Sequence, residues 1–198
     1  SLGQNFITDN NFLLKMNDHI DSSKRNIIIE IGPGKGALTE YLSKKNFKKL
    51  FLIEKDINLA KQLKLKYKKL KNIFIINDDA LTFDYNIFKD KEEKVIIYGN
   101  LPFNISTNLL TKWISDNEWP SFFNKMVLMF QKEVADRIIA SHNNKKYGRL
   151  SVLVQSRCNV KKILDAPASI FSPKPKVDGA VIQLKPIDKY GKINFNKL

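Results

Sequence analysis

The chain has 198 residues, of which 43% are hydrophobic, and this suffices for one domain with a substantial core. Lys and Arg number 34 against 20 Asp and Glu, so the net charge is +14. Such a surface attracts polyanions, nucleic acid before anionic membrane, although a lysine-biased proteome produces the same excess. A single cysteine excludes an internal disulfide and a zinc site built on several thiolates. With no membrane-length apolar run and no signal-peptide pattern, we predict a cytoplasmic protein.

Apolar runs and helical patterns alternate along most of the chain. In chain order they predict a strand at 27–31, a helix at 37–45, a strand at 50–53, a helix at 56–70, strands at 73–76 and 95–98, a helix at 105–114, a strand at 126–130 and a helix at 133–140. Two late strands are predicted at 150–154 and 179–184, without a long helix between them. Because strands that alternate with helices form parallel sheets, we predict an α/β fold with helices on both faces and the late pair as an antiparallel edge.

The predicted helix at 56–70 has apolar positions for packing and many lysines around them. These lysines, within the helix and just beyond it, are Lys61, Lys64, Lys66, Lys68, Lys69 and Lys71. A solvated helix face explains them at least as well as direct contact with RNA, so both interpretations stay open.

A glycine-rich turn at 30–36 joins the first predicted strand to the first helix. Glycines let the backbone approach a ligand closely, although a purely structural turn has the same composition. Glu54 ends the next strand 20 residues after Gly34, where an acidic ligand of a ribose is expected. A nucleoside-containing cofactor is therefore predicted, with NAD and S-adenosylmethionine equally consistent. Asp79 follows the third strand and is placed to accept the amino group of adenine; Asp78 is the alternative, and either residue also suits turn capping.

The tetrapeptide Asn100-Leu101-Pro102-Phe103 follows the fourth predicted strand, at the edge where cofactor and substrate meet. The exocyclic amine of adenine is a weak nucleophile because its lone pair is delocalised into the ring. The Asn100 side-chain oxygen and the Leu101 carbonyl are two acceptors that would favour a pyramidal nitrogen aimed at a methyl donor. Pro102 restricts the backbone that aims the carbonyl, and Phe103 offers a face to an unstacked base. Taken alone, an ordinary turn explains the four residues equally well. This chemistry requires no metal, and the two histidines lack ligand spacing, so no metal site is expected.

Five segments, in this order, resemble the ribosomal RNA adenine dimethyltransferases, most closely the bacterial small-subunit branch. They are 2–7, 30–36, 100–107, 147–151 and 171–177. The resemblance implies a Rossmann-like class I methyltransferase fold, with a mostly parallel seven-stranded sheet and an antiparallel edge strand. It implies S-adenosylmethionine as the cofactor and methylation of N6 of two adjacent adenosines near the 3′ end of 16S rRNA. The implied partner is 16S rRNA in the 30S subunit or its precursor, bound by a monomer.

The resemblance also assigns roles to individual residues. Asn100, Leu101, Pro102 and Phe103 would form the catalytic loop, with Asn100 in contact with both the cofactor and the target amine. Phe103 and Phe171 would stack on the two faces of the target base. The cofactor would be bound by Gln4, Asn5, Ile7, Gly32, Gly34, Glu54, Asp79 and Asn100.

Two features depart from the family's pattern. The family's tetrapeptide commonly ends in Tyr, whereas this chain has Phe103. The phenylalanine keeps the stacking face but lacks the hydroxyl, so we expect any effect to be on the reaction rate. The family also has a C-terminal helical domain that grips RNA. We expect a methyltransferase domain at 1–186, followed at 187–198 by a linker or the start of that helical domain.

Three other functions agree with parts of the pattern. The antibiotic-resistance branch methylates an adenine of 23S rRNA with the same machinery, but Leu101 and the run at 173–177 favour the small-subunit branch. A non-catalytic nucleic-acid binder on the same fold is disfavoured by the intact Asn100 and Glu54. An NAD-dependent oxidoreductase gives the tetrapeptide no role.

Overall fold

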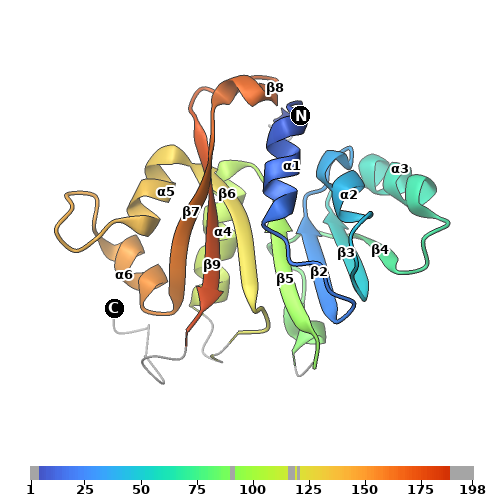
Figure 1. Ribbon diagram of the computed structural model, residues 1–198, viewed down its shortest axis with the longest axis horizontal. Coiled ribbons are helices and arrows are strands. Elements are labelled where there is room, and N and C mark those ends of the chain that lie inside the picture. Colours follow the sequence, from blue (N-terminus) through green and yellow to red (C-terminus); the bar gives the residue numbers. More distant parts are fainter. Residues whose placement is uncertain (1–4, 90–91, 116–118, 120, 188–198) are drawn as a thin grey trace.

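The computed structural model describes residues 5–89, 92–115, 119 and 121–187. Within these ranges the chain forms a seven-stranded sheet in the order β4-β3-β2-β5-β6-β9-β7, with helices on both faces (Figure 1). The strands of this sheet are β2 (Asn26–Ile31), β3 (Lys49–Glu54), β4 (Ile73–Asn77), β5 (Lys94–Gly99), β6 (Lys125–Gln131), β7 (Cys158–Ala166) and β9 (Gly179–Pro186). A second, two-stranded sheet pairs β1 (Phe6–Ile7) with β8 (Phe171–Ser172).

The helices connect the strands and cover the sheet. They are α1 (Asn10–Asp18), α2 (Ala37–Leu42), α3 (Ile57–Tyr67), α4 (Phe103–Ile114), α5 (Lys132–Ile139) and α6 (Arg149–Gln155), with short 3₁₀ turns η1 (Tyr85–Phe88) and η2 (Ala168–Ile170). In the described ranges, no helix has the length and apolar character that crossing a membrane requires.

Alternate side chains of each parallel strand enter two separate cores. Ile27, Ile29 and Ile31 of β2 belong to the core that α4, α5 and α6 cover. Ile28 belongs to the core on the opposite face, which α1, α2 and α3 cover. Since both faces of β2 are buried, every position of the strand is buried, which explains why four of its six residues are isoleucine.

The predicted α/β fold with a mostly parallel sheet is confirmed. β2 pairs in parallel with β3 and β5, and the parallel pairing continues outward to β4 and β6. The antiparallel strand was expected at the edge, but β9 lies one place inside it, between β6 and β7. The physical reason is burial: β9 is buried at most of its positions, whereas β7 alternates with exposed polar residues and suits the edge.

The secondary structure predicted at 150–154 is wrong. These residues lie in α6, where Ser151 and Val154 are buried and Val152 is 40% exposed. Buried positions three residues apart fit a helix, and a segment of five residues, four of them apolar, is too short to separate the two periodicities. The strand that follows, β7, was not predicted because exposed residues such as Lys161 and Lys162 interrupt its apolar pattern.

Candidate active site

A cavity of about 520 Å³ lies at the carboxyl ends of β2, β3 and β5. The chain runs from β2 through α2 to β3 on one side and from β5 through α4 to β6 on the other. The strand order therefore reverses between β2 and β5, and this is the switch point where such sheets bind ligands. Several chain segments bring predicted site residues to its wall. These residues are Asn5, Ile7, Gly32, Gly34, Glu54, Asp79, Asn100, Leu101 and Pro102.

The glycine turn lines this cavity and packs tightly against two side chains. Gly32 and Gly34 have φ angles of 62° and 58°, in the left-handed region that favours glycine. A Cβ atom at Gly32 would lie 2.6 Å from Cδ2 of Leu101, and one at Gly34 would lie 2.9 Å from Cε1 of Phe6. Both positions therefore require glycine for the backbone angle and for the close approach.

Glu54 is held in place by the backbone around it. Its side chain is 2% exposed, and its Oε2 accepts a hydrogen bond of 2.9 Å from the Gly34 N–H. Its Oε1 accepts a second bond, also of 2.9 Å, from the Asp56 N–H. A carboxylate has about four acceptor positions, so these two bonds fix the group and leave positions for further donors.

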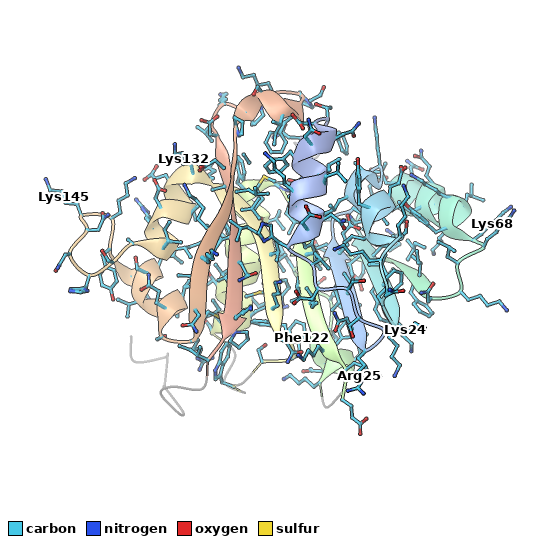
Figure 2. All side chains as sticks on the ribbon, viewed as in Figure 1. Lys24, Arg25, Lys68, Phe122, Lys132 and Lys145 are labelled. Atoms are coloured by element: carbon cyan, nitrogen blue, oxygen red, sulfur yellow. The ribbon has the colours of Figure 1, made fainter. Side chains whose placement is uncertain are left out.

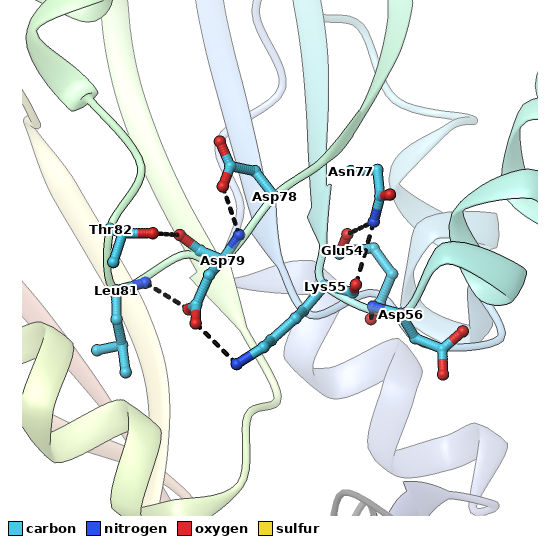
Figure 3. Close-up of polar contacts among 8 residues, drawn as sticks. All are labelled: Glu54, Lys55, Asp56, Asn77, Asp78, Asp79, Leu81 and Thr82. Atoms are coloured by element: carbon cyan, nitrogen blue, oxygen red, sulfur yellow. Dashed lines mark hydrogen bonds and ion pairs between the residues drawn. The ribbon is translucent and has the colours of Figure 1, made fainter.

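Asp78 and Asp79 both line the cavity, and their bonding differs (Figure 3). Asp79 Oδ2 accepts a 2.8 Å hydrogen bond from Lys55 Nζ, and its Oδ1 accepts one of 2.9 Å from the Leu81 N–H. These bonds, that of Lys55 first, lower the pKa of Asp79 below its ordinary value. Asp78 instead uses Oδ1 to accept the Asp79 N–H at 2.7 Å. Asp79 is thus an ionised acceptor that already has a cationic partner.

Glu30 is a further lining residue to which the sequence had assigned no role. Its side chain is 2% exposed, and the Thr39 hydroxyl donates a 2.7 Å hydrogen bond to its Oε2. Burial, opposed by this bond and reinforced by the charge of Glu54, raises the pKa of Glu30 to about 8. The sequence feature that could have identified Glu30 as a site residue is its acidic side chain within a run of isoleucines that forms a buried strand.

The tetrapeptide lies between the glycine turn and α4. Asn100 directly follows β5, and Leu101 is only 7% exposed because it packs against Gly32. Pro102 caps α4 at its N-terminus, where its carbonyl accepts a 2.9 Å hydrogen bond from the Ile105 N–H. Turn and helix therefore fix the backbone from which the Asn100 side chain projects.

The two aromatic rings predicted to hold the base lie outside the described lining of the cavity. Phe103 is half-buried, and its ring lies 3.1 Å from where a Cβ of Gly179 would be. Phe171 is 6% exposed and pairs with Ile7 in the small sheet.

The N-terminal segment closes one side of the cavity through that sheet. Asn5, Phe6, Ile7 and Thr8 line the cavity, and the Thr8 N–H donates a 2.8 Å hydrogen bond to the Ile170 carbonyl. Gln4, which was also predicted to contact the cofactor, lies outside the described residues.

Comparison with known proteins points to one family. A family model described as "Ribosomal RNA adenine dimethylase" matches residues 1–197. A protein of Pelagibacter ubique named "Ribosomal RNA small subunit methyltransferase A" is 47% identical over 197 residues, which are 100% of this chain and 73% of that protein. A protein of the same name from Proteus mirabilis is 40% identical over 93% of this chain, which spans 66% of the relative.

Solved structures agree with this result. A dimethyladenosine transferase from Plasmodium falciparum has a TM-score of 0.83 and 30% identity, covering 96% of this chain and 66% of that one. The 23S rRNA methyltransferase ErmE has a TM-score of 0.75 over 93% of this chain and 70% of its own, and at 24% identity this likeness shows the fold alone. The chain therefore belongs to the ribosomal RNA adenine dimethylase family of methyltransferases.

Proposed function

We propose that this chain transfers methyl groups from S-adenosylmethionine to N6 of two adjacent adenosines near the 3′ end of 16S rRNA. The observation that carries the proposal is that Glu54 and Asn100 line one cavity, because the first suits a ribose and the second suits an aromatic amine. We further propose that it acts as a cytoplasmic monomer on the 30S subunit or its precursor.

The residues of the cavity fit this cofactor. Glu54 keeps acceptor positions beyond its two backbone bonds, and these suit the paired hydroxyls of a ribose. Gly32 and Gly34 present backbone without a side chain, which suits the methionine end of the molecule. Asp79 would accept the adenine amine, and it would do so beside its bond to Lys55. We propose that Asn5 and Ile7 complete the enclosure from the N-terminal segment.

The catalytic work of the chain is to position the amine. S-adenosylmethionine, when bound, supplies an electrophilic methyl group on a positively charged sulfur. Asn100 Oδ1 and the Leu101 carbonyl would each accept an N–H of the target amine, which directs its lone pair at that methyl group. Pro102 keeps the carbonyl in place through its role at the start of α4. Water then takes the proton that the methylated nitrogen loses.

Stacking of the target base is the part of the proposal that requires movement. Phe103 is half-buried at the start of α4, next to Asn100, and can present a face to a base from there. Phe171 is 6% exposed, so its ring has to rotate out of the core before it can form the opposite wall. We propose that entry of the base displaces this ring.

We propose residues 1–186 as the methyltransferase domain and 187–198 as a linker or the start of a C-terminal helical domain. The end of β9 at Pro186 supports this boundary. The 2.8 Å bond from the Ile187 N–H to the Arg157 carbonyl holds the first residue after β9 against the domain.

The test is transfer of a labelled methyl group to 30S particles that lack the modification, followed by identification of the modified nucleoside. We expect N6,N6-dimethyladenosine at two adjacent positions near the 3′ end of 16S rRNA. Naked 23S rRNA serves as the second substrate, and methylation of that RNA alone would assign the chain to the antibiotic-resistance branch. Binding of RNA without methyl transfer to either substrate would favour a non-catalytic binder.

A further inference from the structure

A second groove, of about 580 Å³, lies at the edge of the sheet where β4 is the outermost strand among the described residues. We call it the basic edge groove. Lysines and aromatic residues from β3, α3, the turn after α3 and β4 contribute to its wall. They include Phe51, Lys64, Tyr67, Lys68, Lys71 and Phe74.

The charge around this groove has one sign. The sequence from 57 to 72 contains six lysines and no acidic residue, and the described lining of the groove contains no carboxylate. Lys64, Lys68 and Lys71 are exposed, and Figure 2 shows Lys68 at the outer end of the molecule, beside α3. Lys66, by contrast, lies 3.4 Å from Glu40 in an ion pair and is absent from the groove's described lining. The groove therefore carries cations that are free to meet anionic groups of a ligand.

Phe74 gives the groove an exposed aromatic face. It is 38% exposed on the edge strand, and its ring stacks on Phe51 with centroids 5.1 Å apart and an angle of 22° between the planes. Phe51, which is half-buried, in turn meets the buried Phe88 edge-on at 5.0 Å, so rings from the core support the platform. The Lys49 ammonium lies 5.7 Å from the Phe74 centroid. Aromatic faces beside cations bind unstacked bases of single-stranded nucleic acid.

We propose that the basic edge groove binds the substrate RNA, with backbone phosphates at Lys64, Lys68 and Lys71 and one unstacked base on Phe74. This inference rests on the proposed function, because it assumes that the substrate is RNA. Lysines alone also protect an edge strand from pairing with other strands, but that role does not account for an exposed phenylalanine among them. β3 connects the two sites, since it provides Phe51 to the groove and Glu54 to the cofactor cavity.

The test compares the full chain with the triple variant Lys64→Gln/Lys68→Gln/Lys71→Gln and with Phe74→Leu. A matched triple variant, Lys15→Gln/Lys24→Gln/Lys185→Gln, removes the same charge at exposed positions elsewhere. We measure the Kd for unmodified 30S particles and for a single-stranded RNA oligonucleotide across salt concentrations, together with KM for the particles in methyl transfer. Binding of S-adenosylhomocysteine and the melting temperature check that each variant is folded.

We expect the groove triple variant to weaken RNA binding and to reduce the slope of log K against log salt by about two. Phe74→Leu should raise the Kd roughly fivefold or more, because it removes one stacked base. An equal loss in the matched triple variant would overturn the proposal, since general charge would then explain it. So would groove variants that bind RNA normally but lose binding to vesicles containing phosphatidylserine. If the groove variants raise the Kd for RNA but the native chain methylates no RNA, the groove proposal is supported and the proposed function is overturned. If the native chain methylates RNA and the groove variants leave Kd and KM unchanged, only the groove proposal is overturned.

Discussion

Glu30 places an ionisable group inside the cavity in surroundings that disfavour its charge. Because its pKa is raised to about 8, the folded chain holds a proton there that the unfolded chain releases above the ordinary carboxyl range. Protonated, the group can also donate a hydrogen bond, which an ionised carboxylate cannot do. Glu30 therefore makes the free energy of unfolding fall as the pH rises, whereas a carboxylate in an ion pair makes it fall as the pH drops.

We predict that Glu30→Gln removes a pH-dependent part of the stability. In the native chain, this group's contribution to the free energy of unfolding is fully present below the ordinary carboxyl pKa. It falls by roughly 1 kcal/mol per pH unit as the pH rises toward about 8. Urea denaturation of both proteins between pH 5 and 9 measures the difference. The exposed Glu40→Gln is the control, and parallel curves for the native chain and Glu30→Gln would contradict the prediction.

Asn100→Ala should separate catalysis from binding. If Asn100 accepts an N–H of the target amine as the lone pair develops, kcat should fall by about a hundredfold or more while the Kd of the cofactor changes little. Single-turnover methyl transfer and calorimetry measure the two effects. Asn108→Ala, at an exposed position of α4, is the matched control, and a native rate in Asn100→Ala would rule out the assigned mechanism.

Among the elements, the turn between β2 and α2 has the strictest steric demands. Gly34 combines a φ of 58° with the Phe6 ring 2.9 Å from any added Cβ, and its N–H bonds to Glu54. Changing this residue affects the turn, the Glu54 side chain and β1 at once.

Gly34→Ala is predicted to lower the free energy of unfolding by about 1–3 kcal/mol, from backbone strain and displacement of Phe6. Gly148→Ala is the matched control, because an added Cβ there has nothing within 4 Å and the backbone is extended, with φ of −161°. Denaturation midpoints compare the two variants. Equal denaturation midpoints would mean that the turn tolerates a side chain at Gly34, and that neither backbone strain nor close packing explains why glycine is found there.

Whether an individual strand or helix is predicted correctly from the sequence depends on how deeply it is buried. The strand at 27–31 was predicted because both of its faces are buried and isoleucine occupies every position except Glu30. β7 was missed because one side is exposed, so lysines interrupt its pattern. The error at 150–154 has the same physical origin, since a short apolar segment suits either a strand or a helix until its neighbours are known.

A ligand that binds in the cavity near Glu54 and Asn100 is expected to stabilise the whole folded chain against unfolding. A ligand that binds only the folded chain at a concentration one hundred times its Kd stabilises it by about 2.7 kcal/mol. We predict that S-adenosylhomocysteine raises the melting temperature accordingly and that NAD does not. A shift with NAD and none with S-adenosylhomocysteine would return the glycine turn to a dinucleotide-binding role.

The sequence by itself determined the alternation of strands and helices, the glycine turn, the spacing of Glu54 and the tetrapeptide at 100–103. These are local features, because periodicity, turn chemistry and short spacings are encoded by residues that lie close together in the chain.

Only the tertiary structure decided the place of β9 inside the sheet, the pairing of Ile7 with Phe171 and the bond between Lys55 and Asp79. It alone also decided that Glu30 loses its water and faces the cavity. Each of these depends on contacts between distant segments, and on a loss of solvent that arises only when those segments pack together.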